Sequence, residues 1–207
     1  MRYLKLATDA ILAALTAILA ARLESVSAHE ILGMAAAASV GLHAALNFKF
    51  FKNIFKEGYS AARILNSSII AAMALFAIVS LITGALNSQS LFSFLGLDGS
   101  LETRRLHAAS AYWLFVLAAV HAGLNIEKAI PRFAVKTPAA IASTAAICIL
   151  GAFAFFERGM PAKLFKFSAF DFSGRGAAEN FALNLCVFFA LAISAFCLKK
   201  FLTDKQK

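Results

Sequence analysis

The sequence predicts an all-α protein, an integral membrane bundle of about six transmembrane helices. The first observation is composition: 61% of the 207 residues are hydrophobic, 15% are charged, and the mean hydropathy is +0.77. Ordinary soluble domains carry about 25% charged residues. The second observation is a series of apolar segments, each close to the roughly 20 residues that cross a bilayer core. The chain is therefore expected to form one transmembrane domain over residues 1–207, with no separate soluble module.

Six apolar segments are expected to span the membrane, over residues 6–23, 28–48, 65–86, 106–126, 137–156 and 181–198. The first follows Arg2 and Lys5 and contains Asp9, which we expect at the interface because it is about one helical turn past Lys5. A signal peptide cleaved after Ala28 is an alternative for this segment. Its apolar run is longer than a usual signal core, which disfavours cleavage.

The later segments differ in their polar content. The second and fourth each carry two histidines, whereas the third, fifth and sixth contain no charged residue. Asp98-Gly99 marks a turn in the polar connector before the fourth segment. The connector before the sixth segment, residues 157–180, has mixed charge and many phenylalanines. We expect it to lie along the membrane surface, with its aromatic rings at the level of the lipid headgroups.

Basic residues predict the orientation of the chain. With six spans, both termini and the loops after the second and fourth segments share one side of the membrane. That side collects thirteen basic residues: Arg2, Lys5, Lys49, Lys52, Lys56, Arg63, Lys128, Arg132, Lys136, Lys199, Lys200, Lys205 and Lys207. The other side collects seven: Arg22, Arg104, Arg105, Arg158, Lys163, Lys166 and Arg175. Because cytoplasmic loops are enriched in Lys and Arg, both termini are expected in the cytoplasm.

Net charge and cysteine content exclude two further classes of function. The net charge of +9 does not indicate a nucleic-acid partner, because the basic residues lie beside apolar segments. The three cysteines form neither a C-x-x-C nor a C-x-x-C-H motif. The sequence therefore encodes no dithiol motif and no covalent attachment of a c-type haem.

The four histidines of the chain lie in two matched pairs on the second and fourth apolar segments. His29 and His43 are fourteen residues apart, and so are His107 and His121. Fourteen steps of about 100° return a helical side chain to within roughly 40° of its start, so both histidines of a segment share one face. A rise of about 1.5 Å per residue separates them by roughly 21 Å along the helix axis.

The second and fourth segments cross the membrane in the same direction, because a single span separates them. His29 and His107 are therefore expected at one depth near the outer face, and His43 and His121 at another near the inner face. Two facing helices would offer two opposed imidazoles at each depth, the axial pair of a six-coordinate b-type haem. The sequence predicts two non-covalently bound haem b groups with these four histidines as iron ligands.

Small residues and flanking cations fit the same hypothesis. The histidine faces also carry Gly33, Ala36, Val40, Ala111, Leu114 and Ala118, which would leave space for flat macrocycles. Arg104 and Arg105 are expected beside the propionates of the outer haem, and Lys49, Lys52 or Lys128 beside those of the inner haem. Both features also occur in membrane helices without haem, since small residues allow close helix packing and flanking charges mark the interface.

Three alternatives to haem ligation fit the histidines less well. A lone intramembrane histidine often hydrogen-bonds to a neighbouring helix, but two matched pairs are hard to obtain from packing alone. A transition-metal site on one helix is disfavoured by the separation of its histidines. A histidine-using proton or metal transporter would need acidic residues at mid-membrane, whereas Glu30 and Glu102 lie at the outer edge of their segments.

The second to fourth segments resemble a known family. The likeness rests on His29-Glu30-Ile31-Leu32-Gly33, on His43 with Leu46-Asn47, and on Leu106-His107, Ser110-Ala111-Tyr112-Trp113 and His121-Ala122-Gly123-Leu124. These residues are similar to the four-helix haem core of cytochrome b of the bc complexes. They resemble more closely a bacterial family of small di-haem membrane cytochromes b, catalogued as a domain of unknown function and associated with flavinylated proteins. Asn125 departs from the further histidine expected in that family.

The resemblance implies transmembrane electron transfer in the bacterial inner membrane. A two-haem relay with no soluble catalytic domain leads to the hypothesis of a link between the quinone pool and a flavoprotein or c-type cytochrome outside the cytoplasm, with a quinone as a further ligand. The chain would then be an electron-transfer subunit with possible quinone oxidoreductase activity. The alternatives are a ferric-reductase-like haem subunit, the histidine-using transporter, and an anchor subunit in which the helices merely pack. The sequence does not indicate the oligomeric state.

Overall fold

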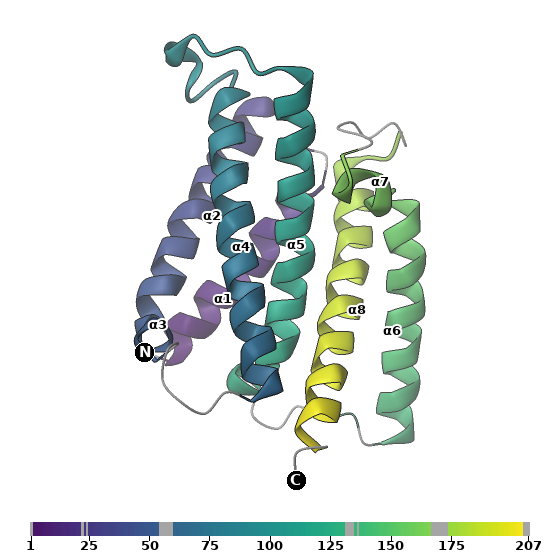
Figure 1. Ribbon diagram of the computed structural model, residues 1–207. Helices are drawn as coiled ribbons and strands as arrows, with labels where there is room; N and C mark the ends of the chain where they lie inside the picture. The colour runs from purple at the N-terminus through teal and green to yellow at the C-terminus, as the bar shows by residue number, and fades with distance from the viewer. Residues whose placement is uncertain are drawn as a thin grey trace.

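The computed structural model describes residues 2–21, 23, 25–53, 60–130, 135, 137–166 and 174–204. Within them the chain forms six long helices: α1 (Arg2–Leu19), α2 (Val26–Leu46), α4 (Ala61–Leu86), α5 (Leu101–Ala129), α6 (Pro138–Glu157) and α8 (Ala177–Asp204) (Figure 1). Three short elements connect them: α3 (Phe48–Lys52), the 3-10 helix η1 (Ser93–Leu95) and α7 (Met160–Leu164). The described part contains no strand, so the all-α prediction is confirmed.

Four of the long helices begin at a hydroxyl residue that caps the first turn. The side chains of Ser25, Ser60, Ser100 and Thr137 each accept a hydrogen bond from the backbone N–H three residues further on. Such caps satisfy N–H groups that have no partner within the helix. These residues explain why α2, α4, α5 and α6 begin where they do.

Four helices, α4, α5, α6 and α8, are long and apolar enough to cross a membrane. They indicate a membrane protein, and a bundle of such helices is compatible with contact to lipid. The other two long helices are not among these four: α1 contains Lys5 and Asp9, and α2 contains two histidines and Glu30. All six predicted spans overlap long helices, but the crossing of the membrane by α1 and α2 stays a prediction. Six residues used for the orientation lie outside the described residues: Arg22, Lys56, Arg132, Lys136, Lys205 and Lys207.

Helix α5 is the centre of the bundle and packs against α4, α8, α7 and α1. Its buried residues Phe115 and Ala119 belong to the main apolar core. Gly123 allows close approach to α8, because a Cβ there would overlap the backbone of Ala192. On the far side, α6 packs against α8, and Gly151 sits against Cys186 and Ala190 for the same reason.

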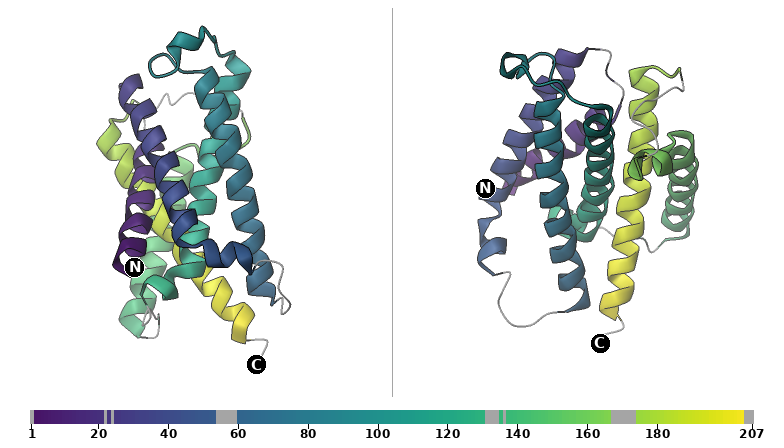
Figure 2. Two further views of the ribbon diagram at one scale, coloured as in Figure 1. Left: turned by 90° about the vertical axis from the view of Figure 1, so that its left-hand side faces the viewer. Right: turned by 45° about the horizontal axis from the view of Figure 1, so that its top comes forward.

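Helix α2 lies on the opposite side of the bundle and packs along α1 (Figure 2). It contains no fully buried residue. The beginning of α1 and the end of α8 point toward one end of the bundle, and the connector containing η1 joins α4 to α5 at the other end (Figure 1). In this arrangement the two histidines of α2 face α5.

The first half of the connector expected along the membrane surface is partly buried within the protein, and its position relative to the membrane stays a prediction. Helix α7 packs against α5 and α6, with Met160, Lys163 and Leu164 buried. Phe165 is exposed, and residues 167–173 lie outside the described residues.

Arg158, expected as an interfacial residue, is only 2% exposed. Its guanidinium donates to the side-chain oxygens of Asn180 (2.6 Å) and Asn184 (3.1 Å) on α8 and to the carbonyl oxygen of Ala20 (2.8 Å) at the end of α1. A buried charge is tolerated where hydrogen bonds replace its hydration. The two asparagines supply these bonds, and Arg158 thereby ties α1, α8 and the α6–α7 turn together.

Candidate functional site

The four histidines meet in the two expected pairs across the space between α2 and α5. The ring centres of His29 and His107 are 6.1 Å apart, with an interplanar angle of 76°. Those of His43 and His121 are 6.4 Å apart, with an angle of 79°. The two helices therefore run in the same direction with matched heights, so that each level holds one imidazole from each helix.

The separation within each pair fits two imidazoles on opposite sides of one metal ion. An imidazole nitrogen binds a first-row metal ion at about 2.0–2.1 Å and lies about 1.1 Å from the centre of its own ring. Two rings in line through one ion then have centres about 6.2–6.4 Å apart. The observed 6.1 and 6.4 Å agree with this value. Direct edge-to-face packing of two rings gives a similar separation, so the distance alone does not distinguish ring packing from metal ligation. The hydrogen bonds of the rings bear on this distinction.

We call the level of His29 and His107 the outer level and that of His43 and His121 the inner level, after the orientation expected from the sequence. At the outer level, helix α4 fixes the ring of His107. Its Nδ1 donates a hydrogen bond to the carbonyl oxygen of Ser80 at 3.0 Å, and the hydroxyl of Thr83 lies 3.4 Å from the same nitrogen. A carbonyl oxygen only accepts, so this bond places the proton on Nδ1 and leaves the lone pair on Nε2. Metal-binding histidines commonly donate their second ring nitrogen to a carbonyl or carboxylate in this way.

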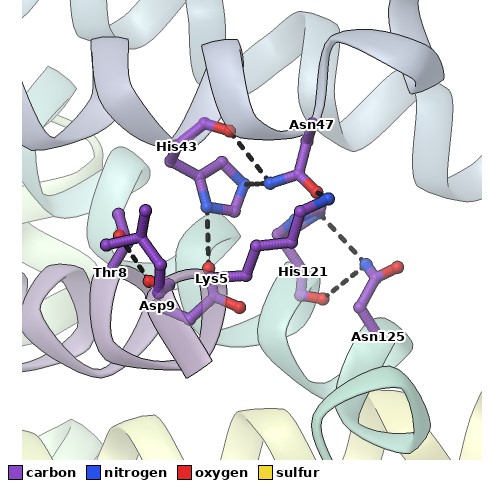
Figure 3. A network of polar contacts seen from close by, with 8 residues as sticks. Lys5, Thr8, Asp9, His43, Asn47, His121 and Asn125 are labelled. Carbon is purple, nitrogen blue, oxygen red and sulfur yellow. Dashed lines mark hydrogen bonds and ion pairs between the residues drawn. The ribbon is translucent and has the colours of Figure 1, made fainter. Parts of the chain in front are cut away.

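At the inner level, a carboxylate has the same role (Figure 3). Nδ1 of His43 donates to Oδ1 of Asp9 on α1 at 2.7 Å, so the lone pair is on Nε2, which lies 3.5 Å from the side-chain nitrogen of Asn47. The sequence led us to expect Asp9 as an interfacial residue, but the structure shows that it contacts a histidine. One turn earlier, Lys5 Nζ donates to Oδ1 of Asn47 at 3.1 Å, so two side chains of α1 hold the end of α2.

His121 has amide groups beside it. The side-chain nitrogen of Asn125, one turn further along α5, lies 3.4 Å from Nδ1 of His121 and donates to its carbonyl oxygen at 2.9 Å. The same amide nitrogen donates to Oδ1 of Asn66 on α4 at 2.8 Å. Lys128 donates to Oδ1 of Asn125 at 2.6 Å. A polar network from two helices thus closes the inner end of the site.

The histidine face of α2 is loosely covered. A Cβ added at Gly33, one turn after His29, would meet no atom within 4 Å. Ala36 is partly buried and Val40 is 45% exposed. On α5, the small residues Ala111 and Ala118 on the histidine face are partly buried. The open space beside Gly33 and the small residues on both histidine faces are therefore compatible with a flat group held between the two helices.

The predicted cationic partners lie in different surroundings. Arg105 forms an ion pair with Glu102 at 3.0 Å, and Lys166 approaches the same carboxylate at 3.2 Å. Arg104 lies at the outer end of α5. At the inner end Lys49 is exposed, and Lys52 lies 5.3 Å from the ring centre of Phe48.

Glu30 has a structural role that the sequence did not reveal. Its carboxylate accepts hydrogen bonds from the hydroxyl of Ser88 and from the backbone N–H groups of Gln89 and Leu91, all at 2.7–2.8 Å. It therefore anchors the connector after α4 to the start of α2. This anchor lies one residue from His29 and helps to fix the height of the outer pair.

Tyr112 and Trp113 pack in the core. The hydroxyl of Tyr112 donates to the carbonyl oxygen of Ala20 at 3.3 Å. The indole of Trp113 donates to the carbonyl oxygen of Leu164 at 3.0 Å and stacks on Phe76. These contacts account for both side chains as structural residues of the core.

Within the described residues, no group of three or more histidine, cysteine, aspartate or glutamate side chains comes together to hold a metal ion. Each histidine pair would thus need a group that brings its own equatorial ligands, as a porphyrin does. Comparisons with protein-family models, with curated proteins and with solved structures find no match.

Proposed function

We propose that this protein is a di-haem b-type cytochrome that carries electrons across a bacterial inner membrane. The proposal is supported most directly by the two histidine pairs, His29–His107 and His43–His121, in each of which the rings face each other between the same two helices. With roughly 21 Å of helix between them, one pair would lie toward each side of a bilayer core about 30 Å thick.

The chain's residues would bind and orient two haem b groups. The four histidines would supply both axial ligands at each level, and Ser80 and Asp9 would fix the tautomer and ring direction of His107 and His43. When bound, each haem supplies an iron centre that gains or loses one electron. With both axial positions taken by imidazole, neither level has an open position for oxygen or substrate. The protein would therefore be a relay: one electron enters at one level and one leaves at the other.

The donor and acceptor are expected at the two faces. A quinone at one face and a flavoprotein or c-type cytochrome at the other fit a two-haem protein without a soluble catalytic domain. A quinol gives up two electrons and two protons, so it would deliver its electrons to such a relay one at a time. The excess of basic residues beside the termini supports an orientation with both termini in the cytoplasm.

A ferric-reductase-like haem subunit is a second candidate of the same class. The number of haems per chain and the flavin content of its partner distinguish it from the first proposal. A histidine-using proton transporter is the candidate from another class, and the Asp9–His43 contact favours it, because carboxylate–histidine chains serve as proton relays. The second to fifth apolar segments carry no Asp or Glu in their interiors, which weighs against it.

The test is a pyridine haemochrome assay with optical spectra of the protein purified in lipid or detergent. We expect two b-type haems per chain, both low-spin in both oxidation states. We also expect reduction by a quinol or by a reduced flavin. Protein that folds without haem, or haem that neither donor reduces, would overturn the proposal.

A further inference from the structure

We infer that Asp9 is a positioning residue for His43 and that it makes the inner histidine level the more reducing of the two. The inference rests on the proposed function, because it concerns haem iron bound at both levels. It adds a direction: electrons pass spontaneously from the His43–His121 level to the His29–His107 level.

Asp9 contacts the imidazole ring of His43 directly. Its Oδ1 lies 2.7 Å from Nδ1 of His43, which is short for a hydrogen bond between these groups and typical of a charge-assisted one. The bond joins α1 to α2, two helices that pack along each other. Asp9 therefore holds the direction of the imidazole and keeps its proton on Nδ1, so the lone pair is on Nε2.

The two levels differ in what accepts the Nδ1 proton. At the inner level the acceptor is an anionic carboxylate, whereas His107 at the outer level donates to the neutral carbonyl of Ser80. A carboxylate acceptor draws the ring toward imidazolate and makes it a stronger electron donor to the metal. A stronger donor stabilises oxidised iron over reduced iron, and so does the negative charge of Asp9 itself. The inner level should thus have the lower reduction potential.

Neighbouring charges can raise or lower the reduction potential of the inner level, so the test must separate the effect of the Asp9 carboxylate from theirs. Lys5 and Lys128 lie at the same end of the site, where their positive charges favour reduced iron. Asp9→Asn keeps the shape of the side chain and leaves both lysines in place. Asp9→Glu keeps the charge. Glu127→Gln removes a carboxylate at the same end of α5 that pairs with Lys199 and Lys200 and serves as the matched control.

The experiment is a potentiometric titration of the purified protein followed by its optical spectrum. In the unaltered protein we expect two resolved midpoints. His43→Ala should remove the lower one and keep the upper one. Asp9→Asn should raise the lower midpoint by at least the equivalent of a tenfold change in the equilibrium constant for one-electron reduction, about 59 mV. Asp9→Glu should restore most of this shift, and Glu127→Gln should move neither midpoint.

Several results would overturn the inference and leave the proposed function intact. The first is a protein with two haems in which Asp9→Asn shifts neither midpoint. The second is an equal shift from Glu127→Gln, which would make the effect one of general charge. The third is a His43→Ala variant that retains the lower midpoint, a result that does not depend on the folding of any Asp9 variant. Failure of the proposed function itself would appear earlier, as unaltered protein without haem.

Discussion

Gly84 of α4 lies directly against His107 of α5. A Cβ at position 84 would stand 3.2 Å from Cε1 and 3.4 Å from Nδ1 of the imidazole, tighter than most real contacts. The absence of a side chain at Gly84 is what lets Nδ1 of His107 reach the carbonyl of Ser80, one turn earlier on α4. Helix α4 therefore shapes the outer level although it carries no histidine.

This contact predicts a graded effect of side-chain size at position 84. Gly84→Ala requires a shift of a few tenths of an ångström and should keep two haems per chain. Gly84→Val cannot be accommodated without moving the ring of His107, so the haem content should fall toward one per chain. Pyridine haemochrome analysis of the purified variants measures this content. Gly41→Val is the control, because a Cβ at Gly41 meets no atom within 4 Å; a similar loss in that variant would contradict the prediction.

The second prediction rests on the proposed function and states which two histidines bind the same haem. His29→Ala and His107→Ala should lose the same haem, and His43→Ala and His121→Ala should lose the other, because each pair faces one common position. Redox titration of the four variants should give two groups of two, each retaining one midpoint. If the phenotypes instead group by helix, the pairs do not share an ion.

Local sequence patterns predicted the four histidines, whereas their partners depend on tertiary structure. The fourteen-residue spacing fixes the face and height of His107 and His121 through helix geometry alone. No comparable rule gives the register of α1 against α2. The spacing of Lys5 and Asp9 suggested only a local arrangement near the interface, and their contacts with Asn47 and His43 come from that register.

Arg158 shows a second limit of sequence reasoning. An arginine after an apolar segment usually marks the membrane interface, so the sequence did not lead us to expect that Arg158 is buried. The sequence did hold a signal, because Asn180 and Asn184 are four residues apart at the start of an apolar helix and therefore share a face. Two amides on one buried face require a polar partner from another element. Only the fold shows that this partner is Arg158.

The third prediction is that Arg158→Leu destabilises the bundle strongly. Asn180 and Asn184 are fully buried and would lose their hydrogen bonds to the guanidinium, as would the carbonyl oxygen of Ala20. Stranding buried polar groups in this way costs roughly 3–5 kcal/mol in all. Thermal unfolding in detergent, followed by circular dichroism, measures the loss.

Arg158→Lys should recover little stability, because an ammonium group cannot reproduce the planar fork that reaches both asparagines and the carbonyl. Arg105→Ala is the control: it removes an arginine whose ion pair with Glu102 lies at the surface, so it should leave the unfolding temperature nearly unchanged. Equal losses in Arg158→Leu and Arg105→Ala would contradict the structural role of the buried arginine.

The fourth prediction separates two adjacent arginines at the outer end of α5. Arg104 precedes His107 by three residues, about 60° away around the helix, whereas Arg105 precedes it by two and points about 160° away. Arg105 is moreover engaged by Glu102. Of the two, Arg104 is therefore placed to approach an anionic group bound at the outer level. Removing a cation beside a haem favours oxidised iron, so Arg104→Ala should lower the outer midpoint in a redox titration, while Arg105→Ala should leave it unchanged. Equal shifts in the two variants would mean that neither arginine acts through a specific contact and that both contribute only to the general charge of the surface.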